Sequence, residues 1–344
     1  MQAMDLSVLI PTHRRPEAID RCLSHLAAQH CDALFEVIIG LDGDEQGTPR
    51  PIIPESLVNK TRLVRPGRVG LPRLRRAMMQ DASGRIVLWL NDDAYPQPGL
   101  LAAHLQAHRE ASTPRVVAGQ AQWFPVEHPT LFDRLVQQSD LVFFQQPDGS
   151  ESCATTYRNC FGLNVSFRRD MALEVGGVAE VDEHYGYEDI ELAWRLSRGG
   201  AECVYEPRAV VEHDHRYRAI DVHRREYLLG RAAWAFAHAS PEFACELFGC
   251  DLRDPLVTEQ LSTAVDLGWR DALRIERSFL SLGDHGPESV DADLLPVLAE
   301  HWVMLKRLLW RWGVLDAQRG IASRWSLLRE TASESVLCAL QDPV

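Results

Sequence analysis

The chain has 344 residues, of which 46% are hydrophobic and 25% charged, and its formal net charge is −13. This composition is that of a globular protein with one large domain or two, and not of a disordered chain. The acidic balance argues against a nucleic-acid-binding protein, which needs a basic surface, but not against a phosphate-bearing substrate, because a bound metal can reverse the local charge. The eight cysteines form no C-x-x-C pair, and no apolar run approaches the roughly 20 residues of a membrane span, so we expect a soluble, cytoplasmic protein.

The first third of the chain alternates between strand and helix patterns. Short apolar runs predict strands and apolar residues at helical spacing predict helices, in the order 6–10 (strand), 16–27 (helix), 35–41 (strand), 61–64 (strand), 74–81 (helix) and 86–90 (strand). This alternation predicts βαβ units and a mainly parallel sheet, an α/β fold. Crossovers in such sheets are right-handed, so we expect these strands to end at one edge.

The middle third continues the α/β pattern less regularly. The same patterns predict helices at 100–110, 169–175 and 190–197 and strands at 116–119, 165–167, 203–205 and 210–211. Residues 123–148 fit neither pattern clearly.

From about Asp221 the strand patterns vanish and long helical patterns dominate. We therefore predict an α/β domain over residues 1–220 and an all-helical domain or extension over 221–344, whose role the sequence does not define. One predicted helix in this region carries an apolar stripe made of Trp302, Leu305, Leu308, Leu309 and Trp312. Such a stripe is usually a core or dimer face, but flanking basic residues keep peripheral membrane contact open as an alternative.

The most informative motif is Asn91-Asp92-Asp93, which follows directly on the apolar run 87–90. Residues 94–96 (Ala-Tyr-Pro) predict a turn after it. Carboxylates at the carboxyl end of a buried strand lie where open α/β sheets bind ligands. Two neighbouring acids repel each other, and a hard divalent cation that carries a phosphate-bearing substrate would hold them together. A solvated turn that caps the next helix is an equally good explanation of the motif alone.

A second acidic motif, Glu188-Asp189, lies at the start of a predicted helix. Acids at this position can simply stabilise the helix dipole. Alternatively, one of them is a general base that takes a proton from an attacking hydroxyl. The preceding Gly186 and Tyr187 suit a loop that faces a substrate.

Taken in order, these segments resemble family-2 glycosyltransferases. The matching segments are 6–16 with 22–29, 37–43, 70–84 with Arg75, 91–93, 162–169 with 175–177, 186–192, and Pro207 with the cluster His213-Asp214-His215. The resemblance covers about residues 5–218 and is specific as a set, although each motif alone is weak. The helical region lies outside it.

The resemblance implies a GT-A fold, in which a Rossmann-like sheet with flanking helices binds a nucleoside-diphosphate sugar at its strand ends. Asp93 would ligate a metal together with His213, with His215 as the fallback, although both histidines can also be ordinary loop residues. A histidine ligand suits Mn²⁺ better than Mg²⁺, so the cofactor is expected to be Mn²⁺ or Mg²⁺. The donor would be bound by Pro11, Thr12, Arg14, Asp42, Arg75, Asn91 and Asp92.

The family pattern also implies an inverting mechanism with Asp189 as the general base and Glu188 as the second choice. On the acceptor side we expect Trp123, Tyr187 and Glu191; Trp123 can equally be a core residue. The expected partners are a nucleotide-sugar donor, most simply a UDP-sugar, and a glycan, lipid-linked or small-molecule acceptor. A homo-oligomer or peripheral membrane contact through the helical region is also open.

Two positions depart from the family pattern. Leu41 replaces the first aspartate of the pair that usually ends the second strand, and Asn91 replaces the first acid of the metal motif. These changes keep a non-catalytic nucleotide-sugar-binding or scaffold protein of the same fold as the alternative. A sugar nucleotidyltransferase fits poorly, because residues 11–16 lack the glycine-rich loop of those enzymes.

Overall fold

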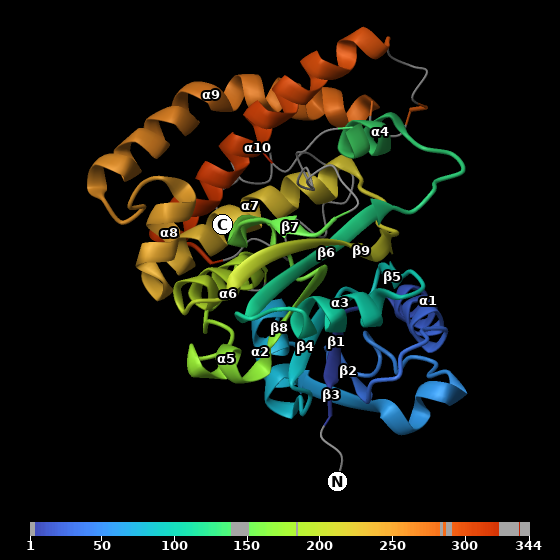
Figure 1. Ribbon diagram of the computed structural model, residues 1–344. Coiled ribbons are helices and arrows are strands. Elements are labelled where there is room, and N and C mark those ends of the chain that lie inside the picture. Colours follow the sequence, from blue (N-terminus) through green and yellow to red (C-terminus); the bar gives the residue numbers. More distant parts are fainter. Residues whose placement is uncertain are drawn as a thin grey trace. The chain divides into compact units, whose positions relative to one another are not determined.

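The computed structural model describes residues 4–138, 151–183, 185–282, 285–286, 291–322 and 337. The chain divides into two compact units (Figure 1). Unit 1 comprises Met1–Pro125, Gln146–Glu180 and Glu188–His215, and unit 2 comprises Val126–Gln145, Val181–Tyr187 and Arg216–Val344. Two short segments from within the first 215 residues thus belong to unit 2.

One half of the unit 1 sheet is parallel. Its strands are β1 (Leu6–Thr12), β2 (Phe35–Asp42), β3 (Thr61–Gly67) and β4 (Ile86–Leu90), in the order β3-β2-β1-β4. Every residue of β1, β2 and β4 is buried, which explains their continuous apolar runs. Because β1 pairs in parallel with both β2 and β4, the residues that end these strands meet at one edge of the sheet.

The other half makes the sheet mixed, where the sequence predicted a mainly parallel one. Strand β8 (Asn164–Arg168) lies antiparallel to both β4 and β6 (Arg115–Trp123), and β9 (Glu202–His213) lies parallel to β6. The two short runs predicted at 203–205 and 210–211 are one strand, whose pairing with β6 shifts register opposite Gly119 and Gln120. Pro207, which has no N–H to donate, lies in the shifted part of β9.

Residues 94–96, predicted as a turn, form the short strand β5 (Ala94–Pro96), antiparallel to the end of β9. Pro96 is tolerated because β5 is an edge strand of the sheet. A further two-residue strand, β7 (Cys153–Ala154), also pairs with β9. Strand β5 matters for the site because it brings Ala94 opposite His213.

Helices connect and cover the strands of unit 1 (Figure 1). Helix α2 (Leu71–Asp81) packs against β1 and β2, and α3 (Leu100–Arg109) packs against β6 and β9. The other helical elements of this unit are α1 (Pro16–Ala27), α5 (Arg169–Glu174), α6 (Glu188–Arg198) and the 3₁₀ turns η1 (Glu55–Lys60) and η2 (Tyr157–Asn159).

Unit 2 is helical. Its elements are α4 (Leu131–Gln138), α7 (Ala219–Ala239), α8 (Pro241–Phe248), α9 (Pro255–Leu282), η4 (Ala292–Leu294) and α10 (Leu295–Gln318). Helix α4 lies in the segment 123–148 that the sequence left open, and residues 139–148 of that segment lie outside the described residues.

Helices α7 and α10 approach each other closely at two glycines. A Cβ atom on Gly230 would lie 1.9 Å from the Trp310 carbonyl oxygen, and one on Gly313 would lie 2.0 Å from that of Tyr227. Four members of the apolar stripe on α10 are buried, namely Trp302, Leu305, Leu308 and Leu309. The stripe is therefore a packing face. Among the described helices, none is both long and apolar enough to span a lipid bilayer.

Candidate active site

The two carboxylates that follow β4 share a cationic partner from the segment after β1. Asp92 and Asp93 are both buried. The Arg15 Nη1 atom lies 3.2 Å from Asp92 Oδ1 and also contacts Asp93 Oδ2. The Thr12 hydroxyl, expected beside the nucleotide, donates to Asp92 Oδ2 at 2.6 Å. Arg15 was missed in the sequence, although the repulsion between two adjacent acids already called for a positive neighbour.

The environment pushes the pKa values of the two acids apart. Burial raises the pKa of Asp92 to about 6, and the charge of Arg15 offsets only part of this effect. Burial acts on Asp93 in the same direction, but His213, His215 and Arg15 together outweigh it and hold the pKa of Asp93 well below its usual range. Asp93 is therefore the stronger acid of the pair and is ionised at neutral pH.

Two histidines lie close to the carboxylate of Asp93. His215 Nδ1 is 2.8 Å from Asp93 Oδ2, and His213 Nε2 is 3.4 Å from Asp93 Oδ1. The two imidazole rings are stacked, with centroids 5.6 Å apart and planes at 4°. One ligand atom from each of Asp93, His213 and His215 lies within 4.8 Å of the others. The structure thus brings together both candidate histidines, where the sequence had made them alternatives.

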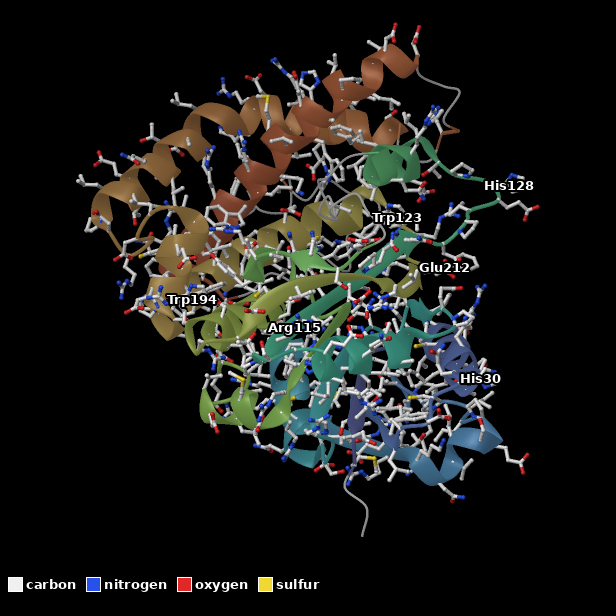
Figure 2. All side chains as sticks on the ribbon, in the orientation of Figure 1. His30, Arg115, Trp123, His128, Trp194 and Glu212 are labelled. Atoms are coloured by element: carbon white, nitrogen blue, oxygen red, sulfur yellow. The ribbon has the colours of Figure 1, made fainter. Side chains whose placement is uncertain are left out.

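This donor set fits a divalent cation. Burial lowers the pKa of His215, so its imidazole is held in the neutral form that binds metal. One ionised carboxylate and two imidazoles form a nitrogen- and oxygen-donor set of the kind that transition-metal ions favour. His213 is fixed by strand pairing, because it ends β9 between Ala94 of β5 and Trp123 of β6. Figure 2 marks Trp123 at the end of β6 and Glu212 near the end of β9.

A separate cluster surrounds Asp214, the residue between the two histidines. The Arg21 guanidinium lies over the rings of Tyr95 and Phe124, at 4.7 and 4.3 Å from their centroids. Both Arg21 Nη1 and the Tyr95 hydroxyl reach Asp214 Oδ2, at 3.3 and 3.2 Å. The Asp214 amide also donates to the Asp93 carbonyl at 2.8 Å. These contacts anchor the segment 213–215 to α1, β5 and the motif after β4.

The end of β2 is tied to the loop after β3. Asp42 Oδ1 accepts hydrogen bonds from the amides of Val69 at 2.7 Å and Gly70 at 3.2 Å. His13 Nδ1 lies 2.5 Å from the Asp42 carbonyl and must donate to it, which leaves Nε2 to accept from Arg68 at 2.9 Å. Asp42, predicted to bind the donor base, therefore also holds this loop.

The other predicted donor residues lie on or beside β1. Pro11 is buried within β1. Arg14 is exposed and has a left-handed backbone with φ of 57°. Its side chain is therefore accessible to a ligand, whereas that of Pro11 is not.

The acidic pair at the start of α6 has unequal members. Glu188 is 2% exposed and lies 2.5 Å from Arg75 Nη1. The Asp189 side chain is 18% exposed, and its Oδ2 accepts a hydrogen bond from the Gly162 amide at 2.7 Å. Of the two acids, only Asp189 is accessible to an acceptor hydroxyl.

Arg75, expected near the donor, is enclosed by other residues of the protein. Its side chain is 2% exposed, and its Nη2 donates to Asn91 Oδ1 at 3.3 Å and to the Gly162 carbonyl at 3.0 Å. The guanidinium therefore has almost no surface left for the base or diphosphate of a donor. The expected direct contact between Arg75 and the donor is not supported by this placement, and the same burial argues against Glu188 as a base.

The residues predicted on the acceptor side also differ in their surroundings. Trp123 is half-buried, with its ring 5.7 Å from that of His213, so it borders the candidate metal-binding cluster. Tyr187 belongs to unit 2, where its hydroxyl accepts from Trp310 Nε1 at 3.1 Å and its ring packs against the core around Ala233. That packing argues against acceptor contact by Tyr187.

Glu191 is 1% exposed and pairs with Arg195 at 2.7 Å. Arg195 in turn donates to the Gly177 carbonyl at 2.6 Å. Glu191 thus supports the turn after α5, and an acceptor-side role for it is not supported either.

Comparison with known proteins gives the family. The family model described as glycosyl transferase family 2 matches residues 7–175. Residues 7–175 belong to glycosyl transferase family 2.

The chain is 23% identical over 243 residues to an uncharacterized glycosyltransferase, YfnE, of Bacillus subtilis, an alignment that covers 57% of this chain and 61% of the relative. It is 40% identical over 75 residues to a pre-mycofactocin glycosyltransferase of Mycobacterium tuberculosis, covering 22% of this chain and 16% of the relative. The chain thus spans less than two thirds of the length of these relatives.

Among solved structures, the chain resembles the mannosyltransferase PcManGT from Pyrobaculum calidifontis in complex with GDP-Man and Mn²⁺. The two share 16% identity with a TM-score of 0.50, over 92% of this chain and 88% of the other. The fold is of the GT-A type, with a helical C-terminal region formed by α7 to α10.

The acidic pair and both histidines lie beyond the stretch that matches the family 2 model. Hydrogen bonds join them to it, because Asp189 accepts from Gly162 and His215 lies against Asp93. The candidate site of the family 2 domain therefore includes residues from both sides of the matched boundary.

Proposed function

We propose that this chain is a metal-dependent inverting glycosyltransferase, which moves a sugar from a nucleoside-diphosphate sugar to an acceptor hydroxyl. The observation that carries the proposal is the cluster of Asp93, His213 and His215 at the strand ends of a family 2 domain. The expected nucleotide is UDP. The acceptor is expected to be a glycan, lipid-linked or small-molecule hydroxyl.

Asp93, His213 and His215 would hold the cation, and the imidazole donors favour Mn²⁺ over Mg²⁺. A cation at this place would supply charge neutralisation for the leaving diphosphate. Arg15 offers a second positive group beside the same carboxylates, on a side chain that is 42% exposed. Its planar guanidinium suits the oxygens of a diphosphate.

Asp189 is the proposed general base. The acceptor oxygen forms a bond to the anomeric carbon as the bond from that carbon to the diphosphate oxygen breaks, and the hydroxyl proton passes to the Asp189 carboxylate. Two amides, from Gly162 and Ile190, hold that carboxylate in one orientation, at 2.7 and 2.8 Å. Attack from the face opposite the leaving group inverts the anomeric configuration.

The proposal is tested by screening nucleotide-sugars for thermal stabilisation with and without Mn²⁺, because a ligand that binds the folded state raises its stability by mass action. Donors that bind are then assayed for release of the nucleoside diphosphate, in the wild type and in Asp189→Asn. We expect turnover in the wild type only, with donor binding in both. Binding without turnover in the wild type would instead support the non-catalytic alternative that Leu41 and Asn91 keep open.

A further inference from the structure

Arg75 is one of the largest fully buried side chains of unit 1, and its guanidinium joins two parts of the candidate site. We propose that Arg75 is a positioning residue that fixes the proposed base Asp189 relative to the motif that begins at Asn91, without touching the donor. This inference rests on the proposed function, since it takes Asp189 as the base.

One terminal nitrogen of the guanidinium contacts the acidic pair Glu188-Asp189, and the other contacts Asn91. Its Nη1 lies 2.5 Å from Glu188 Oε1 and 3.9 Å from Asp189 Oδ2. Its Nη2 donates to Asn91 Oδ1 at 3.3 Å. The Trp89 ring lies 4.6 Å from the guanidinium carbon and packs against its face. A planar group held on both edges and one face has little freedom to move.

Gly162 completes the connection from Arg75 to Asp189. Its carbonyl accepts from Arg75 Nη2 at 3.0 Å, while its amide donates to Asp189 Oδ2 at 2.7 Å. A Cβ atom at this position would lie 2.1 Å from Arg75 Nη2, so only glycine lets the backbone approach this closely. A displacement of the guanidinium is therefore passed to the Asp189 carboxylate through the backbone of one residue, Gly162.

Glu188 and Asn91 both bind the guanidinium of Arg75. Glu188 supplies the negative charge that a buried guanidinium needs, because an unpaired buried charge is strongly unfavourable. Asn91, where the family has an acid, presents an amide oxygen to the same guanidinium. Lysine cannot replace this arrangement, since a single ammonium lacks the planar fork that reaches both groups.

The first test compares Arg75→Lys with the control Arg73→Lys, an exposed arginine two residues earlier on α2. Two quantities are measured: the dissociation constant of UDP with Mn²⁺, by calorimetry, and the kcat for UDP release from UDP-sugars. We expect Arg75→Lys to leave UDP affinity within about twofold and to lower kcat by about 10- to 100-fold, the size of effect that misplacing a reacting group by about 1 Å produces. The control should change neither quantity.

A large loss of UDP affinity with kcat retained would overturn the inference, because it would make Arg75 a donor-binding residue. An unchanged kcat would overturn it as well. If the wild type neither binds UDP nor releases it, the proposed function fails instead.

A second measurement does not depend on any donor. Hydrogen exchange of the Gly162 and Ile190 amides reports whether the Asp189 carboxylate still holds them. We expect faster exchange at both amides in Arg75→Lys and in the double variant Arg75→Gln/Glu188→Gln, which buries no unpaired charge. Protection equal to the wild type in a folded double variant would overturn the inference.

Discussion

His215 Nδ1 lies 2.8 Å from Asp93 Oδ2, while the stacked ring of His213 faces the other oxygen of the same carboxylate. One side chain after β4 therefore contacts the last residue of β9 and a residue that follows this strand. The antiparallel pairing of β5 with β9 sets this geometry, because it brings Ala94, the residue after Asp93, opposite His213.

The first prediction concerns metal binding by this cluster. His213→Ala and His215→Ala should each weaken Mn²⁺ binding by at least about tenfold, since each removes one of three donors. Titration calorimetry with Mn²⁺ in the absence of nucleotide measures the change. The matched control is His30→Ala, an exposed histidine of unit 1 (Figure 2), which should bind Mn²⁺ like the wild type. Equal affinities for all four proteins would show that the cluster does not hold the metal.

The second prediction concerns Asp214, which points to Arg21 and Tyr95 and not to the proposed metal ligands. Asp214→Ala should lower Mn²⁺ affinity about tenfold, because residues that orient metal ligands typically contribute that much. Tyr95→Phe removes only the hydroxyl and should have a smaller effect in the same direction. A wild-type Mn²⁺ affinity in Asp214→Ala would mean that strand pairing alone positions the two histidines.

The third prediction concerns stability in acid. His104 is fully buried; its Nε2 donates to Asn164 Oδ1 and its Nδ1 accepts from the Ser166 hydroxyl, both at 2.8 Å. Burial lowers the pKa of His104 from 6.5 to about 4. The unfolded chain therefore binds this proton at a higher pH than the folded one, so stability is full above about pH 6.5 and falls as the pH drops toward 4.

The expected loss is roughly 3 kcal/mol between these pH values, at about 1.4 kcal/mol per pH unit. Urea unfolding at a series of pH values measures it. His104→Gln keeps the capacity to form hydrogen bonds but cannot titrate, so its stability should depend less on pH between 4 and 6.5. Parallel curves for the two proteins would rule out His104 as the source.

The fourth prediction concerns the packing of α7 on α10. Gly230→Ala and Gly313→Ala should each destabilise unit 2 by about 1–3 kcal/mol, because the added methyl group would meet backbone of the facing helix. Gly268→Ala in α9 is the control: its Cβ would meet only the end of the Leu308 side chain, at 3.0 Å, and alanine favours a helix. Thermal or urea unfolding of the three variants gives the comparison. A control that lost as much stability would point to a general intolerance of larger residues.

Local patterns of apolar residues were enough to predict most strands of unit 1, because a buried parallel strand appears in the sequence as a short apolar run. Strand β4 has the predicted bounds, Ile86–Leu90. Strand β5 was missed because its three residues, Ala94–Pro96, look like a turn and become a strand only through pairing with β9. The α/β pattern likewise does not reveal that β8 runs antiparallel between β4 and β6.

The acids and histidines of the candidate site are recognisable in the sequence, but the residues that contact them are not. Asp93 and His213 stand out as motifs in the chain, and the structure brings them together. Arg15 and Arg75 find their acidic partners 78 and 113 residues away, and no local pattern encodes such a pairing. The packing of Tyr187 was not predictable for the same reason: its aromatic neighbours Phe236 and Phe248 come from distant helices.

The most direct test of glycosyl transfer is UDP release from UDP-sugars by the wild type and by Asp189→Asn, with Mn²⁺ and with a chelator. The proposed mechanism predicts release by the wild type with Mn²⁺, little without it, and a loss of about 100-fold or more in Asp189→Asn, which should still bind UDP. A wild type that binds UDP and Mn²⁺ but releases nothing from any UDP-sugar would contradict it.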